Sequence, residues 1–417
     1  MTARIEADWL RDPVLQHVLS ILSAGEEEAR VVGGAVRNHL LSQSITDVDV
    51  ATTALPAVVI ERAEAAGLKA VPTGVEHGTV TLVSQGRPFE VTTLRRDHET
   101  DGRHAKVVFG RDWRADAERR DFTINALYCE ADGTIVDLVG GLADIEARRL
   151  RFIGDAAQRI EEDYLRILRF YRFFAWYGDG RPDADGIRAT TRLKDGLSRL
   201  SAERVWAELR KLLAAPDPSR ALLWMRQTGV LTGVLPESER WGIDAIHGLI
   251  EAETAFGWAG DAMLRLEAIV PPDAARLAGL ATRLKMSNTE RDRLTAFAIA
   301  ELPAPDASDA VYRRAMFHGD RQGLADRLRL AIALERARPE ADLARIAILT
   351  RRLSELERFA PPNFPVSGND LIASGLTPGP DLGRQLKALQ DRWVDSGFTM
   401  GRAELLASAG VPPTGST

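Results

Sequence analysis

The sequence predicts an α+β fold in which a mixed α/β head is followed by an entirely helical remainder. Three observations predict it. Short, β-branched apolar segments with strand-like patterning crowd the first third of the chain. After about Arg148 these segments stop and helical periodicity takes over. Proline and glycine then divide the helical part, with breaks near 178–186, 214–218, 268–273, 302–306 and 361–368.

In the head, Arg30 to Val32 is expected to be a strand that leads into a Gly-Gly turn and a short helix. Ile45 to Val50 is expected to resume a strand. The remaining strands are expected as two hairpins, which pair 78–84 with 88–94 and 126–129 with 134–138.

Five later segments carry apolar residues at helical spacing and are expected to be helices: 160–177, 202–213, 219–227, 274–284 and 321–336.

Composition narrows the class of protein. A chain of 417 residues predicts several domains, and 45% hydrophobic with 27% charged residues is ordinary for a soluble protein. The formal net charge of -6 argues against a generally cationic nucleic-acid coat but leaves room for a local basic groove. The single cysteine, Cys129, excludes an internal disulfide framework and a multi-cysteine zinc site. Without a signal-peptide core or an apolar run of transmembrane length, a cytoplasmic protein without membrane contact is expected.

Two carboxylates, Asp47 and Asp49, stand one residue apart in a segment expected to be extended. Residues i and i+2 of a strand point to the same face, so the two side chains would form a doubly negative oxygen site. Such a site suits Mg²⁺, which takes one or two protein carboxylates and completes its shell with phosphates and water. A solvated strand end is the alternative interpretation of this pair.

Gly33 and Gly34 lie just upstream and open a short helix that carries Arg37. A glycine pair allows the backbone to approach a phosphate closely, and the free N–H groups of the helix start favour an anion. Together with the two aspartates, this layout predicts a nucleoside triphosphate held between the turn and a metal site. Alone, a Gly-Gly pair is simply a turn.

Glu90 lies in the apolar strand FEVTTLR. If this strand runs beside the two aspartates, Glu90 supplies a third carboxylate, and three carboxylates can hold two Mg²⁺ ions. Otherwise it is a polar residue on a half-exposed strand.

Arg119 and Arg120 are adjacent and precede Asn125. Two adjacent arginines cannot share one helical face, so the pair is either a surface helix end or a cluster that neutralises a triphosphate. In the second interpretation, Asn125 contacts the sugar or the backbone.

Asp163 and Arg166 are spaced i, i+3 in a segment expected to be one helix. One interpretation is a helical ion pair. The other is that the carboxylate and the guanidinium together pair with the edge of a nucleobase, as a template base would.

The order of these motifs resembles the class II tRNA nucleotidyltransferases, that is, bacterial CCA-adding enzymes and their poly(A) polymerase relatives. The match is dense from about 30 to 237 and returns near 277–297 and 367–387. The stretches that carry it read GGAVRNHLL with DVD, FEVTTLR, the DGRH loop at 101–104, RRDFTINA, DLVGGLADIEARRLRFIGD, EEDYLRILRFYRF, SAERVWAELRKLL, ALLWMRQTGVL, VLPE and SGNDLIASGLTPGPDLGRQL.

The resemblance implies a nucleotidyltransferase-type mixed-sheet head at 1–150, followed by a helical neck at 151–215, a helical body at 216–300 and a helical, tRNA-binding tail at 301–417. It implies template-independent addition of CMP and AMP from CTP and ATP to tRNA 3′ ends, with Mg²⁺ as cofactor and no obligate protein partner. The implied catalytic and metal-binding residues are Asp47, Asp49 and Glu90. The implied nucleotide-binding residues are Gly33, Gly34, Arg37, Arg119, Arg120, Asn125, Asp163, Arg166 and Arg169.

Two departures and three alternatives accompany the resemblance. Asn38 stands where the family usually has aspartate, so we leave it out of the expected metal site, and Leu138 stands where many members have proline.

A poly(A) polymerase and an enzyme that adds only CC or only A are sister interpretations. Arg103, His104 and Lys106 favour the capacity to switch from C to A. A non-catalytic RNA-binding homologue is the alternative from another class, and the retained carboxylates argue against it.

The segment 311–360 holds eleven Arg against seven Asp or Glu, a balance of +4. This stretch is expected either to follow tRNA phosphates or to be a solvated helical surface.

Overall fold

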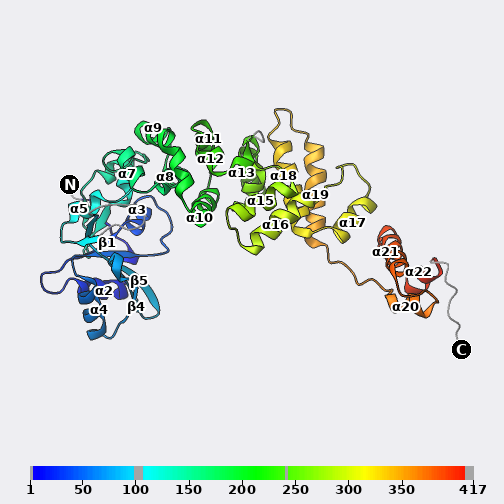
Figure 1. Ribbon diagram of the computed structural model, residues 1–417, viewed down its shortest axis with the longest axis horizontal. Helices are drawn as coiled ribbons and strands as arrows, with labels where there is room; N and C mark the ends of the chain where they lie inside the picture. Colours follow the sequence, from blue (N-terminus) through cyan, green and yellow to red (C-terminus); the bar gives the residue numbers. More distant parts are fainter. Residues whose placement is uncertain (1–2, 98–106, 240–242, 409–417) are drawn as a thin grey trace. The chain divides into compact units, whose positions relative to one another are not determined.

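The computed structural model describes residues 3–97, 107–239 and 243–408. The chain divides into two compact units, residues 1–234 and 235–417. All strands of the described residues lie in the first unit, and the described part of the second unit is helical (Figure 1). The predicted α+β fold, with strands in the first third and helices after it, is therefore confirmed. The finer division into head, neck, body and tail stays a prediction.

The first unit is built on a seven-stranded sheet in the order β3-β4-β5-β2-β1-β8-β9. Strands β2 and β5 pair in parallel, and the other neighbours pair antiparallel. A separate two-stranded ribbon joins β6 and β7. The strands are β1 (Ala29–Val32), β2 (Asp49–Thr52), β3 (Lys69–Gly74), β4 (Thr79–Ser84), β5 (Arg87–Thr93), β6 (Arg95–Asp97), β7 (Val107–Phe109), β8 (Leu127–Cys129) and β9 (Ile135–Asp137).

Both predicted hairpins are confirmed as β4–β5 and β8–β9. The predicted strand over 45–50 is shifted, because β2 begins only at Asp49, which pairs with Val32 of β1. Strand β1 ends there and the chain turns at Gly33, so residues before Asp49 have no neighbouring strand to pair with. Asp47 therefore precedes the strand, so the expectation that both aspartates belong to one strand is wrong, whereas the negative charge of Asp47 still lies close enough to raise the pKa of Asp49.

The helices of the first unit cover the sheet and continue the chain after it (Figure 1). Fully buried side chains of the sheet form the core, among them Val31, Val50, Val80, Leu82 and Leu127. The helices are α1 (Asp8–Arg11), α2 (Pro13–Leu22), α3 (Gly34–Leu40), α4 (Pro56–Ala65), η1 (Val75–His77), α5 (Trp113–Glu118), η2 (Thr123–Asn125), α6 (Gly141–Glu146), α7 (Ala156–Glu162), α8 (Leu165–Tyr177), α9 (Ala184–Leu193), η3 (Lys194–Arg199), α10 (Ala202–Leu213), α11 (Ser219–Gln227) and α12 (Val230–Val234).

The helix predicted over 160–177 is broken into α7 and α8. Asp163 lies between them with an extended backbone, at φ -154° and ψ 106°. Its carboxylate accepts a hydrogen bond from the backbone N–H of Leu165 at 3.0 Å, so it caps the second helix instead of continuing the first. The expectation that Asp163 and Arg166 lie on one helix is therefore wrong.

The second unit contains η4 (Pro236–Ser238), α13 (Asp244–Phe256), α14 (Ala262–Ile269), α15 (Ala274–Arg283), α16 (Asn288–Ile299), α17 (Asp309–His318), α18 (Arg321–Arg336), α19 (Leu343–Arg358), α20 (Gly368–Ala373), α21 (Pro380–Asp395) and α22 (Arg402–Ser408). The helices predicted over 202–213, 219–227, 274–284 and 321–336 are confirmed to within one residue. Among the described helices, none combines the length and the apolar character that a membrane crossing requires.

A buried charged cluster ties three helices of the second unit together. Arg293 on α16 bonds to Asp326 of α18 at 2.9 Å and to Asp261 at 2.7 Å. Glu267 of α14 is 1% exposed, and its carboxyl oxygens have no hydrogen-bond partner. Burial, reinforced by the charge of Asp326, raises the pKa of Glu267 well above its ordinary value of 4.5. Glu267 is therefore protonated well above the pH at which a free glutamate ionises.

We expect Glu267→Gln to make the stability of the second unit decrease less as pH rises. The folded state binds the Glu267 proton more tightly than the unfolded state, so this stabilisation is complete below about pH 4.5 and is lost as pH rises toward the folded-state pKa. The loss amounts to at most about 1.4 kcal/mol per pH unit. In urea unfolding from about pH 5 to about pH 8, the free energy of unfolding of the variant should rise relative to that of the wild type as pH increases. The exposed Glu340→Gln is the matched control, and a parallel pH dependence of Glu267→Gln and wild type would contradict the assignment.

Candidate functional site

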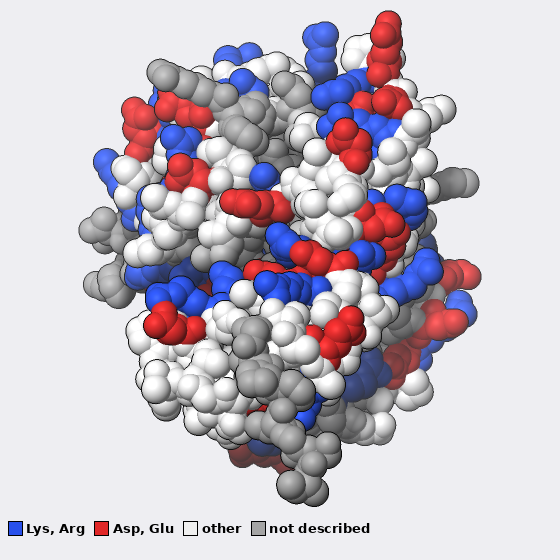
Figure 2. All heavy atoms as spheres, turned by 90° about the vertical axis from the view of Figure 1, so that its right-hand side faces the viewer, with Lys and Arg blue, Asp and Glu red and all other residues white. Residues whose placement is uncertain are grey.

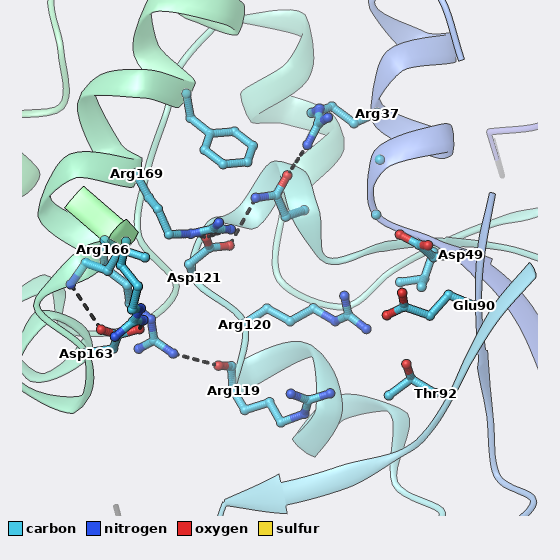
Figure 3. Close-up of a pocket in the computed structure, with 17 residues that line it drawn as sticks. Arg37, Asp49, Glu90, Thr92, Arg119, Arg120, Asp121, Asp163, Arg166 and Arg169 are labelled. Atoms are coloured by element: carbon cyan, nitrogen blue, oxygen red, sulfur yellow. Dashed lines mark hydrogen bonds and ion pairs between the residues drawn. The ribbon is translucent and has the colours of Figure 1, made fainter. Parts of the chain in front are cut away.

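A pocket of about 520 Å³ in the first unit gathers most of the site residues predicted from the sequence (Figure 3). Its lining joins the end of β1 and the start of α3 to β2, β5, the segment after α5, and α8. Of the predicted residues it contains Gly33, Gly34, Arg37, Asp49, Glu90, Arg119, Arg120, Asn125, Asp163, Arg166 and Arg169. Asp47 is not among the lining residues.

Asp49 and Glu90 form the acidic side of the pocket. The parallel pairing of β2 with β5 places these two residues directly opposite each other. Burial against the protein, together with the negative charges of Glu90 and Asp47, raises the pKa of Asp49 to about 6. The predicted approach of the Glu90 strand to Asp49 is confirmed, because β2 and β5 are neighbouring strands of the sheet.

A divalent cation fits the chemistry of this pair. Among the described residues no group of three or more histidine, cysteine or acidic side chains converges to hold a metal. Two carboxylates are nevertheless a common protein contribution to an Mg²⁺ site, because substrate phosphates and water supply the other oxygens. Asp47 accepts a hydrogen bond from the Thr46 hydroxyl at 3.0 Å, and its role as a further ligand stays a prediction.

The glycine turn brings backbone to the edge of the pocket. Gly33 has φ +68°, a left-handed conformation that favours glycine, and its N–H donates to the Leu127 carbonyl at 3.1 Å. A Cβ on Gly33 would lie 3.5 Å from the Asn125 carbonyl oxygen. Because neither Gly33 nor Gly34 carries a side chain, a ligand can approach the main chain closely here.

Arg37 is held by a dense set of hydrogen bonds beneath the pocket. It is 7% exposed, and it donates to the side-chain oxygen of Asn125 and to the Tyr177 hydroxyl, the latter at 2.8 Å. The side chain of Asn38 accepts from two nitrogens of Arg37, at 3.1 and 2.9 Å. The amide that replaces the usual aspartate therefore orients the Arg37 guanidinium.

Arg119 and Arg120 both line the pocket, although adjacent residues of one helix would diverge. Helix α5 ends at Glu118, so the two arginines follow the helix and are free to turn the same way. The buried carboxylate of Asp116 binds Arg119 at 2.6 Å and Arg120 at 3.0 Å. The rule that two adjacent arginines cannot share one helical face does not apply here, because both residues lie beyond the end of the helix.

Asp163 and Arg166 line one side of the pocket, and the backbone N–H of Arg166 donates to the Asp163 carbonyl at 3.0 Å, but their side chains bind other partners. Asp163 forms an ion pair with Arg204 of α10 at 2.6 Å. Arg166 pairs with Glu162 and donates to the Arg159 carbonyl at 2.8 Å. The helical ion pair considered as an alternative from the sequence is therefore wrong, because the break at Asp163 turns the two side chains to different partners.

Sequence reasoning missed two charged residues that line this pocket, Asp121 and Arg204. Asp121 accepts from Arg169 at 2.8 Å and from Asn125 at 3.0 Å. Burial alone would raise the pKa of Asp121, but Arg169 and these hydrogen bonds outweigh it and keep the pKa below its ordinary value. Both residues lie within matched stretches, Asp121 in RRDFTINA and Arg204 in SAERVWAELRKLL, which was the signal available.

The arrangement suits a nucleotide. In Figure 3, Asp49 and Glu90 lie on one side of the pocket and Asp163 with Arg166 on the other, with Arg119 and Arg120 between them. Carboxylates can hold a cation on a polyphosphate, arginines can neutralise the remaining charge, and a carboxylate beside guanidinium groups can read a polar ring edge.

Comparison with known proteins agrees with this geometry. The family described as Poly A polymerase head domain matches residues 29–151, and the family described as Probable RNA and SrmB- binding site of polymerase A matches residues 184–241. The mitochondrial CCA tRNA nucleotidyltransferase 1 of Mus musculus is 34% identical over 412 residues, covering 94% of this chain and 89% of that protein. A CCA-adding enzyme of Leuconostoc mesenteroides is 32% identical, covering 90% of each chain.

Solved structures show the same fold. The crystal structure of the Bacillus stearothermophilus CCA-adding enzyme in complex with CTP aligns with a TM-score of 0.71 at 27% sequence identity, covering 95% of this chain and 96% of that chain. With relatives of this similarity along nearly its whole length, the chain belongs to the family of CCA-adding tRNA nucleotidyltransferases.

Proposed function

We propose that this chain adds CCA to the 3′ ends of tRNA, transferring CMP and AMP from CTP and ATP and releasing pyrophosphate. The observation that carries the proposal is the single pocket in which paired carboxylates, clustered arginines and the Asp163 side chain meet. Relatives that are named for this reaction and match over most of the chain support it.

Different residues of the chain are proposed to have different roles in nucleotidyl transfer. Arg119, Arg120 and Arg37 bind and orient the triphosphate, while Asp49 and Glu90 would hold Mg²⁺. Bound there, Mg²⁺ would supply Lewis-acid chemistry for the attacking tRNA hydroxyl and the leaving pyrophosphate. Asp116 holds two of the arginines in place before the substrate arrives, which lowers the cost of ordering them.

Asp163 is proposed to read the base. Its carboxylate can accept a hydrogen bond from the exocyclic amine that cytosine and adenine share. Uracil and guanine present a carbonyl at the corresponding position, which a carboxylate repels. Arg166 is proposed to donate to a ring acceptor of the same base, since its guanidinium also lines the pocket.

The sister activities remain distinguishable by experiment. Arg103, His104 and Lys106, which favoured a switch from C to A, lie outside the described residues. Poly(A) synthesis and addition of only CC or only A are therefore alternatives within the same proposal. A cytoplasmic location also stays a prediction, and the Mus musculus and Danio rerio relatives are named as mitochondrial.

A single assay tests the function. Purified protein is incubated with tRNA that ends at the discriminator base, with CTP and ATP supplied singly and together. We expect two C residues with CTP alone, and C-C-A with both nucleotides. Addition of only one type of nucleotide would show an enzyme of partial specificity. Synthesis of a long A-tract would show a poly(A) polymerase. No addition at all would indicate a non-catalytic homologue.

The net charge of the segment 311–360 overstates the positive charge that is free to contact tRNA phosphates. Many arginines of this segment are engaged within the second unit, including the ion pairs Arg329–Glu357, Arg338–Glu335, Arg351–Glu355 and Arg352–Asp309. On the face drawn in Figure 2, acidic and basic side chains are intermixed. RNA binding by the tail stays a proposal that rests on exchange of these ion pairs for phosphate contacts.

A further inference from the structure

A second, basic hollow lies beside the nucleotide pocket in the first unit. It has a volume of about 380 Å³, and its lining includes residues of α5, of α7 and of the chain over 151–154. Glu118 and Thr123 line this hollow, whereas the residues between them, 119–121, line the nucleotide pocket. One short segment of chain thus forms part of the wall of both.

Three arginines line the hollow: Arg114, Arg151 and Arg159. Glu118 is the one carboxylate among its lining residues. It lies 3.8 Å from Arg114, and both side chains are more than half exposed, so the attraction between them is weak and easily exchanged. The guanidinium of Arg114 is otherwise bonded to the carbonyl of Leu138 at 3.1 Å.

The carboxylates that bind the other two arginines are each shared with a further arginine. Asp144, which is fully buried, accepts from Arg151 at 3.0 Å and from Arg149 at 2.7 Å. One carboxylate between two guanidinium groups leaves a net positive charge. On the α7 side of the hollow, one carboxylate is likewise shared by two arginines.

On that side, Glu162 is bound by Arg159 at 3.0 Å and also by Arg166. The Nε of Arg159 is buried and has no hydrogen-bond partner. The hollow therefore combines uncompensated positive charge with an unused donor on one of the arginines that line it.

We propose that this hollow, which we call the Arg114 hollow, binds a phosphodiester group of the RNA substrate. The inference rests on the proposed function, because that function supplies an RNA strand whose 3′ end lies in the adjoining pocket. Guanidinium groups match phosphate oxygens in geometry and charge, and such contacts position a strand without reading its sequence. A free phosphate or pyrophosphate would share this chemistry, so the experiment separates the two sources.

The test compares Arg114→Glu with Arg188→Glu. Arg114 is 61% exposed, so reversal of its charge leaves the core intact. Arg188, on α9 of the same unit, is 72% exposed, pairs with Asp185 and does not line the hollow, so it controls for net charge. The dissociation constant for tRNA lacking CCA is measured over a range of salt concentrations, with CTP binding and circular dichroism as folding controls. Inorganic pyrophosphate is titrated as a competitor.

We expect Arg114→Glu to weaken tRNA binding by about tenfold, as for loss of one charge-assisted contact. The slope of log affinity against log salt should fall by about one, while Arg188→Glu changes neither quantity. Equal weakening by both variants, or no change by Arg114→Glu in either tRNA affinity or pyrophosphate competition, would overturn the site. Unchanged tRNA affinity with lost pyrophosphate competition would assign the hollow to a free anion and overturn the RNA assignment. Absence of tRNA binding by the wild type would instead refute the proposed function itself.

Discussion

Asp49→Asn is expected to reduce nucleotide addition by at least about a thousandfold while the protein stays folded, because several kcal/mol of metal-dependent stabilisation of the transition state are lost. Asp49 faces Glu90 across the β2–β5 pair, and the negative charges of the two side chains repel each other. The amide keeps the shape of the side chain and removes that repulsion, so thermal unfolding should shift little or upward. Single-turnover incorporation of CMP with saturating tRNA measures the effect.

The matched control is Glu64→Gln, which removes an exposed carboxylate from α4 of the same unit. Its turnover should equal that of the wild type. The assignment of Asp47 as a further metal ligand predicts a loss for Asp47→Asn of the same order as for Asp49→Asn. Turnover near normal in Asp49→Asn would refute the metal site, whereas normal turnover in Asp47→Asn alone would restrict it to Asp49 and Glu90.

The local parts of this fold were predictable because short-range rules decide them. The strand that ends in the Gly33 turn, the two hairpins and four of the five later helices that were predicted depend on neighbouring residues, and the structure confirms them. The start of β2 was not predictable in this way, since it depends on where β1 stops. The Asp-x-Asp pattern therefore identified a residue of the pocket, Asp49, but included Asp47 in a strand that begins only after it.

The candidate site shows the same division between local and distant causes. The break at Asp163 arises because a capping hydrogen bond to Leu165 competes with continuation of the helix, and periodicity alone favoured one long helix. The partner of Asp163 is Arg204, 41 residues further along the chain. No spacing rule connects two residues so distant, so this ion pair could only be found once α10 was packed against α8.

Asp163 is held by two separate contacts, and this determines how base choice should be tested. One carboxylate oxygen accepts from the Leu165 N–H at 3.0 Å, and the other binds Arg204 at 2.6 Å. Together they fix the side chain at the pocket wall before a nucleotide binds. A rigid acceptor is what template-independent selection needs, because a base that cannot satisfy it leaves buried polar groups unpaired.

Asp163→Asn is therefore expected to relax discrimination against UTP and GTP by about tenfold or more, with activity reduced but not abolished. The amide retains an oxygen for the Leu165 N–H, so the start of α8 should be preserved, while the charge that favours an exocyclic amine is lost. The measurement is single-nucleotide incorporation with each of the four NTPs. Asp155→Asn is the matched control, because Asp155 caps α7 through Gln158 at 2.8 Å but does not line the pocket. Arg166→Ala should relax selectivity in the same direction if its guanidinium reads a ring acceptor. Wild-type selectivity in both pocket variants would mean that Asp163 and Arg166 only stabilise the junction of α7 and α8.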